Sequence, residues 1–324
     1  MRVYRSLEEI AELPGRPRAV AVGTFDGVHR GHQRIISMAV SAARAMDGVA
    51  TVVTFEPHPD SVLHPENAPV LLTPLELKVA LLQELGVQEV VAVPFDREFA
   101  ALAPEDFCRR LLSQRLGARQ VMVGANFRFG HRAAGTPADL LAFGQEQGFS
   151  VSAIHLVEEE GGPVSSTRIR ALVSAGEVEQ AARLLGRPHV LEGPVVGGAR
   201  RGRTMGVPTA NLVPPPGLAI PALGVYVTRT LAGRWGPQPS VTSVGTNPTF
   251  ESDGVVRIET FLLDFDGSLY SERIGVEFLS RIRGQRTFPD AAALSAQMQA
   301  DVAHAEAHFA RLREGPPVPD RGMW

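Results

Sequence analysis

The sequence has only one cysteine, Cys108, so no disulfide bond can form within the chain. Disulfide bonds are typical of extracellular proteins, and their absence favours a reducing compartment. No run of eighteen consecutive apolar residues is present, which argues against a conventional membrane-spanning helix. The first residues, MRVYRS, also lack the apolar run of a signal peptide. We therefore expect a cytoplasmic protein with no membrane partner.

Lysine is almost absent, because Lys78 is the only lysine among the 32 basic residues. The phosphate-binding motif G-x-x-x-x-G-K-[ST] therefore occurs nowhere, and the lysine of a protein kinase is not expected either. Lys78 itself lies in LTPLELKVALLQEL, which has the spacing of a plain amphipathic helix. Any phosphate chemistry must use arginine, histidine, backbone N–H groups and metal.

A surplus of basic charge is also missing, since the net charge is −3 and the pI is near 6.3. Nucleic-acid-binding proteins usually carry such a surplus, so we expect no nucleic-acid partner. The hydrophobic share of 44% and the charged share of 21% are ordinary for a globular protein. A length of 324 residues allows two domains.

The first half of the chain alternates between apolar, strand-like runs and helical patterns. Strands are expected at 19–25, 49–55, 87–95, 119–127 and 150–156, and helices at 32–46, 74–85, 104–116 and 137–147. Continuous apolar strands that alternate with helices predict an α/β, Rossmann-like, doubly wound parallel sheet. Ligands bind such sheets at the carboxyl ends of the strands, where 23–32, 55–59 and 124–130 lie.

The second half contains many glycines and prolines between short apolar runs, and it closes with a helical pattern at about 290–312. Asp266-Gly267 stands between two of these runs and predicts a β-hairpin there. The pattern is typical of an antiparallel barrel or sandwich. We place the domain boundary so that 1–185 forms the first domain and 186–324 the second.

The stretch GTFDGVHRGH, residues 23–32, carries the first candidate site. His29 and His32 are three residues apart in the first turn of an expected helix, so both rings lie on one face. The free N–H groups and the helix dipole at this end form an anion site, which suits a triphosphate. A pair of capping or surface histidines is the alternative, and zinc with His58 and His64 is a weaker one because their spacing fits no known zinc motif.

GTFDGVHRGH matches the H-x-G-H motif of the nucleotidyltransferase superfamily, in the form seen in FMN adenylyltransferases. The segments FEPHP (55–59), GANFRFGHRAAGT (124–136) and VSSTRIR (164–170) also resemble these enzymes. The resemblance implies that His29 and His32 stabilise the ATP phosphates. The further contacts that it implies are with ATP at Gly23, Thr24, Phe25, Gly31, Ser165, Ser166, Thr167 and Arg168, and with the flavin or its phosphate at Asn126, Phe127 and Arg128. His58 either touches the nucleotide or structures its loop.

The stretch GGARRGRTMGVPTANL, residues 197–212, carries the second candidate site. A solvated basic loop is the ordinary interpretation of such arginines. The P-T-A-N sequence, however, resembles riboflavin kinases, and the likeness extends to about residue 312. It implies that Thr209 and Asn211, on one face of an extended segment, hold Mg²⁺ with the ATP phosphates.

The resemblance to riboflavin kinases implies three further roles. Gly202 and Arg203 belong to the loop that wraps the phosphates, Asn247 lines the flavin site, and Glu259 is the base that accepts the proton of the riboflavin hydroxyl. From the residues alone, Glu277 and Asp264 are alternative bases. Cys108 is expected to serve packing, since neither transfer needs a covalent enzyme intermediate.

The chain is thus identified as resembling the bifunctional riboflavin kinase/FMN adenylyltransferase family. The resemblance implies phosphorylation of riboflavin to FMN by the second domain and adenylation of FMN to FAD, with release of pyrophosphate, by the first. It also implies use of ATP and Mg²⁺, and we expect a monomer or a transient homo-oligomer. The alternatives are an H-x-G-H transferase for another phosphate ester, such as pantetheine phosphate, and a flavin-binding regulatory protein without activity.

Overall fold

The computed structural model describes residues 1–10, 15–155, 157–159, 161–196, 209–246, 256–269 and 272–314. The chain forms two compact units, Met1–Ser166 and Thr167–Trp324, which are treated separately below. Within the described residues, no helix combines the length and the apolar character needed to cross a membrane.

The first unit is built on a six-stranded sheet in which every pairing is parallel, with the strand order β1-β4-β3-β2-β5-β6. Its strands are β1 (Arg2–Tyr4), β2 (Arg18–Val22), β3 (Val49–Glu56), β4 (Glu89–Pro94), β5 (Ala118–Gly124) and β6 (Ser150–Ile154). Its main helices are α1 (Arg30–Ala45), α3 (Leu75–Glu84) and α6 (Pro137–Gln147), and its shorter ones are α2 (Pro59–Leu63), η1 (Pro65–Asn67), α4 (Arg97–Ala100), α5 (Pro104–Asp106) and η3 (His131–Ala133). A small hairpin of β7 (Glu158–Glu159) and β8 (Gly162–Pro163) precedes the end of the unit.

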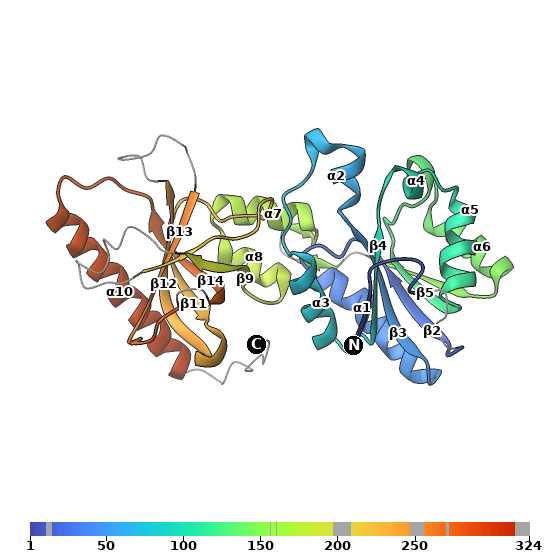
Figure 1. Ribbon diagram of the computed structural model, residues 1–324, viewed down its shortest axis with the longest axis horizontal. Helices are drawn as coiled ribbons and strands as arrows, with labels where there is room; N and C mark the ends of the chain where they lie inside the picture. Colours follow the sequence, from blue (N-terminus) through green and yellow to red (C-terminus); the bar gives the residue numbers. More distant parts are fainter. Residues whose placement is uncertain are drawn as a thin grey trace. The chain divides into compact units, whose positions relative to one another are not determined.

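The central strands are buried along nearly their whole length because helices cover both faces of the sheet. All five residues of β2 are buried, as are the first seven residues of β3. Figure 1 shows α1 and α3 on one side of the strands and α5 and α6 on the other. The buried residues of α1 follow the helical period that an apolar stripe requires. The predicted parallel sheet is confirmed.

The strand order places a topological switch point between β2 and β5. From β2 the chain continues to β3 and β4 on one side, and it returns to β5 and β6 on the other. The crevice at the carboxyl ends of two such strands is the usual ligand site of a doubly wound sheet. The segments that leave these two ends are 23–29 and 125–130, so the two adenylyltransferase-like motifs meet at the switch point.

The expected α-helix 104–116 is different in the structure. A single α-turn, α5, leads into a π-helix, η2, at Phe107–Arg115. Phe107, Leu111 and Leu112 pack in the core of the unit together with Cys108. Burial raises the pKa of the Cys108 thiol to about 12, so the thiol stays protonated and serves packing. Residue periodicity does not distinguish an α-helix from a π-helix here, because the wider turn depends on what the side chains pack against.

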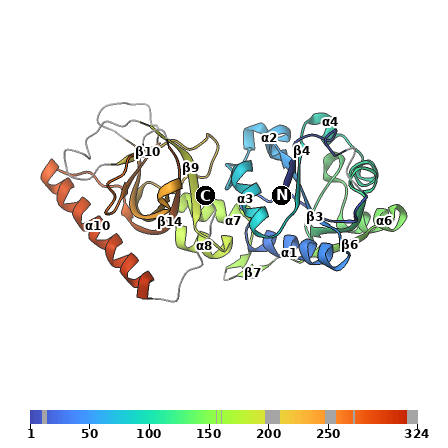
Figure 2. The ribbon, with the colours of Figure 1, turned by 60° about the horizontal axis from the view of Figure 1, so that its bottom comes forward.

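The second unit is a closed antiparallel barrel with the strand order β10-β13-β12-β11-β14-β9. Its strands are β9 (His189–Val196), β10 (Ala210–Leu212), β11 (Gly224–Leu231), β12 (Pro237–Thr246), β13 (Val256–Leu262) and β14 (Arg273–Gly284), and its helices are α7 (Ser166–Ala175), α8 (Val178–Leu185), η4 (Gly233–Trp235) and α10 (Ala291–Glu314). Helix α10 packs on β11 and β12 through Val302, Ala305 and Phe309, and Figure 2 shows it lying along the barrel. The predicted barrel with a final helix is confirmed.

The predicted hairpin at Asp266-Gly267 is wrong. Strand β13, which precedes it, pairs with β10 and β12, whereas β14, which follows it, pairs with β11 and β9. The dipeptide does lie in a turn region, and a side chain at Gly267 would strike the Phe265 ring, with 2.3 Å between Cβ and Cζ. An Asp-Gly pair indicates only that the chain changes direction locally. Which strands pair is decided by the closure of the barrel.

Helices α7 and α8 contact the barrel. The N–H group of Ala222 donates to the carbonyl of Val173 at the end of α7, and Arg281 on β14 donates to the carbonyl of Ala175. Helix α8 packs against β14 and β9. Both helices therefore belong to the second compact unit, which begins N-terminal to the boundary that we placed at 185/186.

Candidate active sites

The two histidines of the H-x-G-H motif form a stacked pair at the start of α1. His29 is the N-cap residue, and its Nδ1 accepts a hydrogen bond from the N–H group of His32 at 3.3 Å. The ring centroids are 3.5 Å apart and the ring planes are 19° from parallel. The edge of Phe25 contacts His32 on another side, with 5.2 Å between centroids. The predicted location of both rings on one face is thus seen in the structure.

His32 carries a polar atom that is available for a ligand. Among the described residues, its buried Nδ1 has no hydrogen-bond partner. Burial, the neighbouring His29 and the Lys78 ammonium hold the pKa of His32 well below its ordinary value. A neutral imidazole both donates and accepts, and a buried polar atom without a partner is costly. A phosphate oxygen at this place would remove that cost.

The glycine between the histidines provides space for the ring of His29. A Cβ atom at Gly31 would lie 3.1 Å from Cε1 and 3.2 Å from Nδ1 of His29. Gly23 likewise provides space for the ring of Phe25, because a Cβ atom at Gly23 would lie 3.2 Å from Cζ of Phe25. The sequence analysis connected these glycines with close approach of phosphate, and the structure adds that they let two rings fold back over the turn.

The turn between β2 and α1 holds two non-glycine residues in the left-handed region. Phe25 has φ 48° and Val28 has φ 40°, next to Gly27 with φ 84°. Such values are rare for bulky and β-branched residues and persist only where surrounding contacts impose them. Phe25 is 1% exposed, so its ring packs inside the protein rather than facing solvent.

We expect Gly31→Ala to slow FAD formation about tenfold, because the added Cβ forces the His29 ring to move by a few tenths of an ångström and so disturbs the geometry of this turn. Alanine is a better helix former than glycine by about 1 kcal/mol, so the thermal unfolding temperature should not fall. Steady-state kinetics of FMN adenylation and a thermal melt of the same preparation would test this. Unchanged kinetics would contradict the packing role of Gly31.

The loop after β5 brings Asn126 next to the strand end beside α1. A Cβ at Gly124 would lie 3.0 Å from Oδ1 of Asn126 and 3.8 Å from Cδ1 of Ile35 on α1. Asn126 and Arg128 are exposed, and Phe127 is half-buried and stacked on Phe129, with 5.5 Å between centroids.

Phenylalanines link this loop to the end of β3 and the FEPHP segment. Consecutive ring centroids lie 5.4 to 6.2 Å apart along the series Phe129, Phe107, Phe99, Phe95 and Phe55. In the same segment, His58 caps α2, since its Nδ1 accepts the N–H group of Asp60 at 3.2 Å. That contact is the loop-structuring role weighed for His58. No group of three His, Cys, Asp or Glu side chains able to hold a metal occurs in the described part of the chain, so the zinc alternative gains no support.

The S-S-T segment begins α7. The Ser166 hydroxyl donates to the carbonyl of Asp26 at 2.9 Å, which ties this segment to the turn before α1. Ser165 is half-buried. Thr167 and Arg168 follow in the first turn of α7 and belong to the second unit. Their contact with ATP stays a prediction.

The predicted helix around Lys78 is present as α3, but the burial of Lys78 was not predicted. Lys78 is 6% exposed, and its Nζ donates to the Thr24 carbonyl of the GTFDG turn at 2.9 Å. The pattern contained a signal, because position 78 falls on the same helical face as Leu75, Leu81 and Leu82, which are all buried. The location of Lys78 on the apolar stripe of the predicted helix therefore indicated that its ammonium group would be buried.

The second candidate site lies on the barrel. Asn211 and Glu259 are direct partners in the antiparallel pair of β10 and β13. Directly opposed residues have Cβ atoms about 4.5–5.5 Å apart on the same face of the sheet. Both side chains are half-buried, as is Thr209 just before β10. The structure thus brings the predicted base next to one of the two predicted magnesium ligands.

The alternative bases have other roles. Glu277 forms a partly buried ion pair with Arg229, whose Nε donates to Oε2 at 2.6 Å. Asp264 is an exposed turn residue with φ 51°. Three predicted contact residues, Gly202, Arg203 and Asn247, lie outside the described residues.

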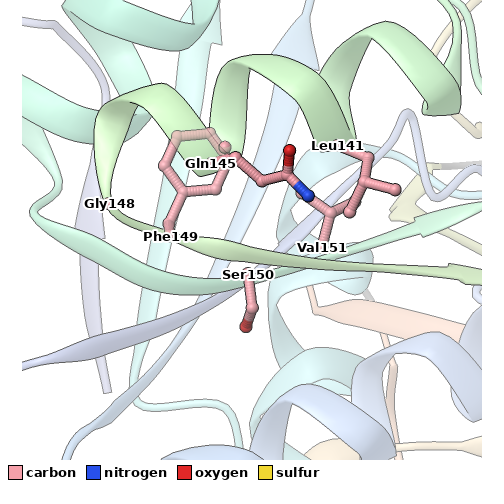
Figure 3. A pocket seen from close by; sticks show the side chains of 7 residues that line it. Leu141, Gln145, Gly148, Phe149, Ser150 and Val151 are labelled. Carbon is pink, nitrogen blue, oxygen red and sulfur yellow. The ribbon is translucent and has the colours of Figure 1, made fainter.

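One open hollow of about 370 Å³ lies away from these groups (Figure 3). It is lined by Leu141, Gln145 and Phe149 and by the first residues of β6. Because the strands are parallel, the start of β6 lies at the amino edge of the sheet, opposite the edge that holds His29.

Comparison with known proteins supports two successive regions. The family model for FAD synthetase matches residues 13–168, and that for riboflavin kinase matches residues 185–309. The bifunctional riboflavin kinase/FMN adenylyltransferase of Pseudomonas fluorescens is 38% identical over 95% of this chain and 97% of its own. The proteins of the same name from Escherichia coli K12 and Bacillus subtilis are 35% and 33% identical over 95% and 91% of this chain, and over 98% and 93% of their own.

A solved structure from Streptococcus pneumoniae, named a macrolide-efflux protein, superposes with a TM-score of 0.83. It is 33% identical and covers 94% of this chain and 98% of its own. The two family regions, their order and the full-length relatives agree with the two sites described above. The chain therefore belongs to the bifunctional riboflavin kinase/FMN adenylyltransferase family, with an N-terminal FAD synthetase region and a C-terminal riboflavin kinase region.

Proposed function

We propose that the stacked pair of His29 and His32 is the catalytic centre of FMN adenylation. The observation that carries this is the buried, unpartnered Nδ1 of His32 at the start of α1, at the switch point of the sheet. In the reaction a phosphate oxygen of FMN bonds to the α-phosphorus of ATP, and the bond from that phosphorus to the bridging oxygen of pyrophosphate breaks. The imidazoles and the helix N-terminus stabilise the charge that develops on the transferred phosphate.

The charge of the substrate assists this role. Anionic phosphates within about 4–6 Å favour the protonated form of an imidazole, so ATP raises the pKa of His32 that burial has lowered. A protonated ring is a stronger donor to the departing pyrophosphate. Thr24, Phe25 and Gly31 contribute backbone N–H groups to the phosphates, and Gly23, whose own N–H group donates to the Val53 carbonyl, contributes space.

The remaining contacts of FMN adenylation with ATP and FMN are proposed as follows. Ser165, Ser166, Thr167 and Arg168 hold the pyrophosphate end of ATP. Asn126, Phe127 and Arg128 receive FMN, and the half-buried Phe127, which is continuous with the phenylalanine series, offers an aromatic face to the flavin ring.

For phosphorylation of riboflavin, Glu259 accepts the proton of the ribityl hydroxyl as its oxygen attacks the γ-phosphorus of ATP. The register that sets Asn211 opposite Glu259 carries this assignment. The neutral oxygens of Thr209 and Asn211 fit Mg²⁺, because this ion keeps waters and takes its charge from phosphates rather than from a protein cage. Bound there, Mg²⁺ screens the phosphate charge. Gly202, Arg203 and Asn247 are proposed to complete the phosphate and flavin contacts.

We further propose that the two functional regions divide at 185/186, at the start of the riboflavin kinase match, although the second compact unit begins earlier, at Thr167. We also propose that the enzyme works in the cytoplasm, as a monomer or a transient homo-oligomer. Nucleic acid and membranes are not among the proposed partners, which are riboflavin, FMN and ATP.

Incubation with riboflavin, ATP and Mg²⁺ should yield FMN first and FAD later when the flavins are separated by chromatography over time. An excess of chelator should stop both conversions, because both transfers need the phosphate charge to be screened. The matched control is the same chelator saturated with Mg²⁺ beforehand. Conversion that continues in excess chelator would contradict the metal assignment, and FMN without FAD would point to another substrate for the first region.

A further inference from the structure

Lys78 on α3 lies directly beneath the turn that presents the two histidines. Its Nζ is 2.9 Å from the carbonyl oxygen of Thr24 and 3.4 Å from Oγ1 of Thr54 on β3. The Thr54 hydroxyl donates to the same carbonyl at 2.9 Å. One carbonyl oxygen of the turn is therefore held by an ammonium group and a hydroxyl, and both Lys78 and Thr54 are buried.

The segment before α3 holds the next residue of the turn. The Asp26 carboxylate accepts the N–H groups of Leu72 and Thr73 at 2.9 and 3.1 Å. The Thr73 hydroxyl oxygen accepts the N–H group of Gly27 at 3.0 Å. Groups from β3, α3 and the segment leading into α3 thus anchor positions 24, 26 and 27, and the Ser166 hydroxyl also holds the carbonyl of Asp26.

These anchors act on the residue that is held in an unfavourable conformation. Phe25, between Thr24 and Asp26, has φ 48°, and its ring supports His32. A left-handed conformation of a phenylalanine costs of order 1–3 kcal/mol and relaxes unless its neighbours are fixed. Release of the Thr24 carbonyl would allow Phe25, and with it His32, to move.

Residue 78 is the only lysine in the sequence, and the other residues counted as lysine or arginine are all arginine. An ammonium is a compact charge with three donors on a flexible stem, whereas a guanidinium is a planar fork. A single carbonyl oxygen beside a single hydroxyl, enclosed between α3 and β3, suits the first shape and not the second.

We infer that Lys78 is a positioning residue of FMN adenylation, which fixes the Thr24 carbonyl and so keeps His29 and His32 in register with the ATP phosphates. This inference rests on the role proposed for the two histidines. The Asp26 and Glu56 carboxylates favour the charged form of Lys78, while burial opposes it and lowers its pKa.

The test uses the full chain with Lys78→Met, which keeps the length of the side chain but removes the charge and the donors. The value of kcat for FMN adenylation should fall between about tenfold and a hundredfold, with KM for FMN within about twofold, because the loop at Asn126 is untouched. Lys78→Arg should lose at least about fivefold, because the planar fork does not fit. Thr54→Val, a milder change on β3, should lose a few-fold. Gln83→Met, at an exposed site on α3, is the matched control and should change nothing.

A thermal melt of each variant reports whether the first unit is folded, and phosphorylation of riboflavin by the second region should be unchanged in every variant. In a His32→Ala background, Lys78→Met should cause a smaller loss than in the parent chain, because only His29 is left for Lys78 to position. The inference would be overturned if kcat for FMN adenylation is unchanged in Lys78→Met, or if both reactions lose rate together. It would also be overturned if the losses of Lys78→Met and His32→Ala multiply in full in the double variant. Full FAD formation by His32→Ala alone would instead overturn the role proposed for the histidines.

Discussion

The double variant His29→Ala, His32→Ala should lose FAD formation while it still converts riboflavin to FMN. Removal of one preorganised donor from a developing negative charge costs about two to three orders of magnitude in rate, and both donors are removed here. The double variant also loses the ring stack, in which the centroids are 3.5 Å apart, and the hydrogen bond from the His32 N–H group to Nδ1 of His29 at the start of α1. The barrel carries neither residue, so its reaction should keep its rate.

The measurement follows FAD from FMN and FMN from riboflavin, in separate assays on one preparation. His304→Ala, at an exposed position on α10, serves as the matched control and should retain both activities. Loss of both activities in a double variant that remains folded would argue against two separate sites. Full FAD formation would remove the histidines from the reaction.

Glu259→Gln should give the opposite result, with riboflavin phosphorylation reduced by about two to four orders of magnitude and FMN still converted to FAD. Glutamine keeps the size of the side chain opposite Asn211 but cannot accept the hydroxyl proton. Asn211→Ala should impair the same reaction, because it removes an oxygen proposed for Mg²⁺. Asn211→Ala should also need a higher Mg²⁺ concentration for half-maximal riboflavin phosphorylation, whereas Glu259→Gln should not. This difference would distinguish the two variants.

Asp264→Asn is the matched control for Glu259→Gln. It makes the same chemical change at an exposed turn residue, and asparagine tolerates the left-handed conformation found there. Both activities should be retained. A riboflavin kinase activity that survives Glu259→Gln but falls in Asp264→Asn would assign the base to the alternative carboxylate.

Much of the architecture was predictable because it depends on local pattern. Continuous apolar strands that alternate with amphipathic helices led to the parallel sheet, and α6 has the predicted bounds, with a capping box at Thr136 and Asp139 and a left-handed Gly148 at its end. The motifs were sufficient to identify both reactions, which the family comparison confirms. Residue types and short spacings were enough for these conclusions.

The errors concern contacts between distant parts of the chain. The Asp266-Gly267 turn was recognised, but its flanking strands pair elsewhere because both edges of β13 are already taken. Residues 107–115 were read as an α-helix, and their π-helical form is a matter of packing in the core. The helix predicted around Lys78 is present, but the pattern did not reveal that its ammonium is buried against Thr24.

The sequence by itself determined the class of each domain and the two reactions, and it supplied the two histidines and the glutamate as the proposed reacting groups. Hydrophobic period and motif chemistry are properties of neighbouring residues, so they can be read along the chain. Only the tertiary structure decided that Gly31 makes room for the ring of His29, that Asn211 faces Glu259 and that a single lysine supports the turn. These are contacts between atoms brought together by strand order and helix packing, and no local pattern records such contacts.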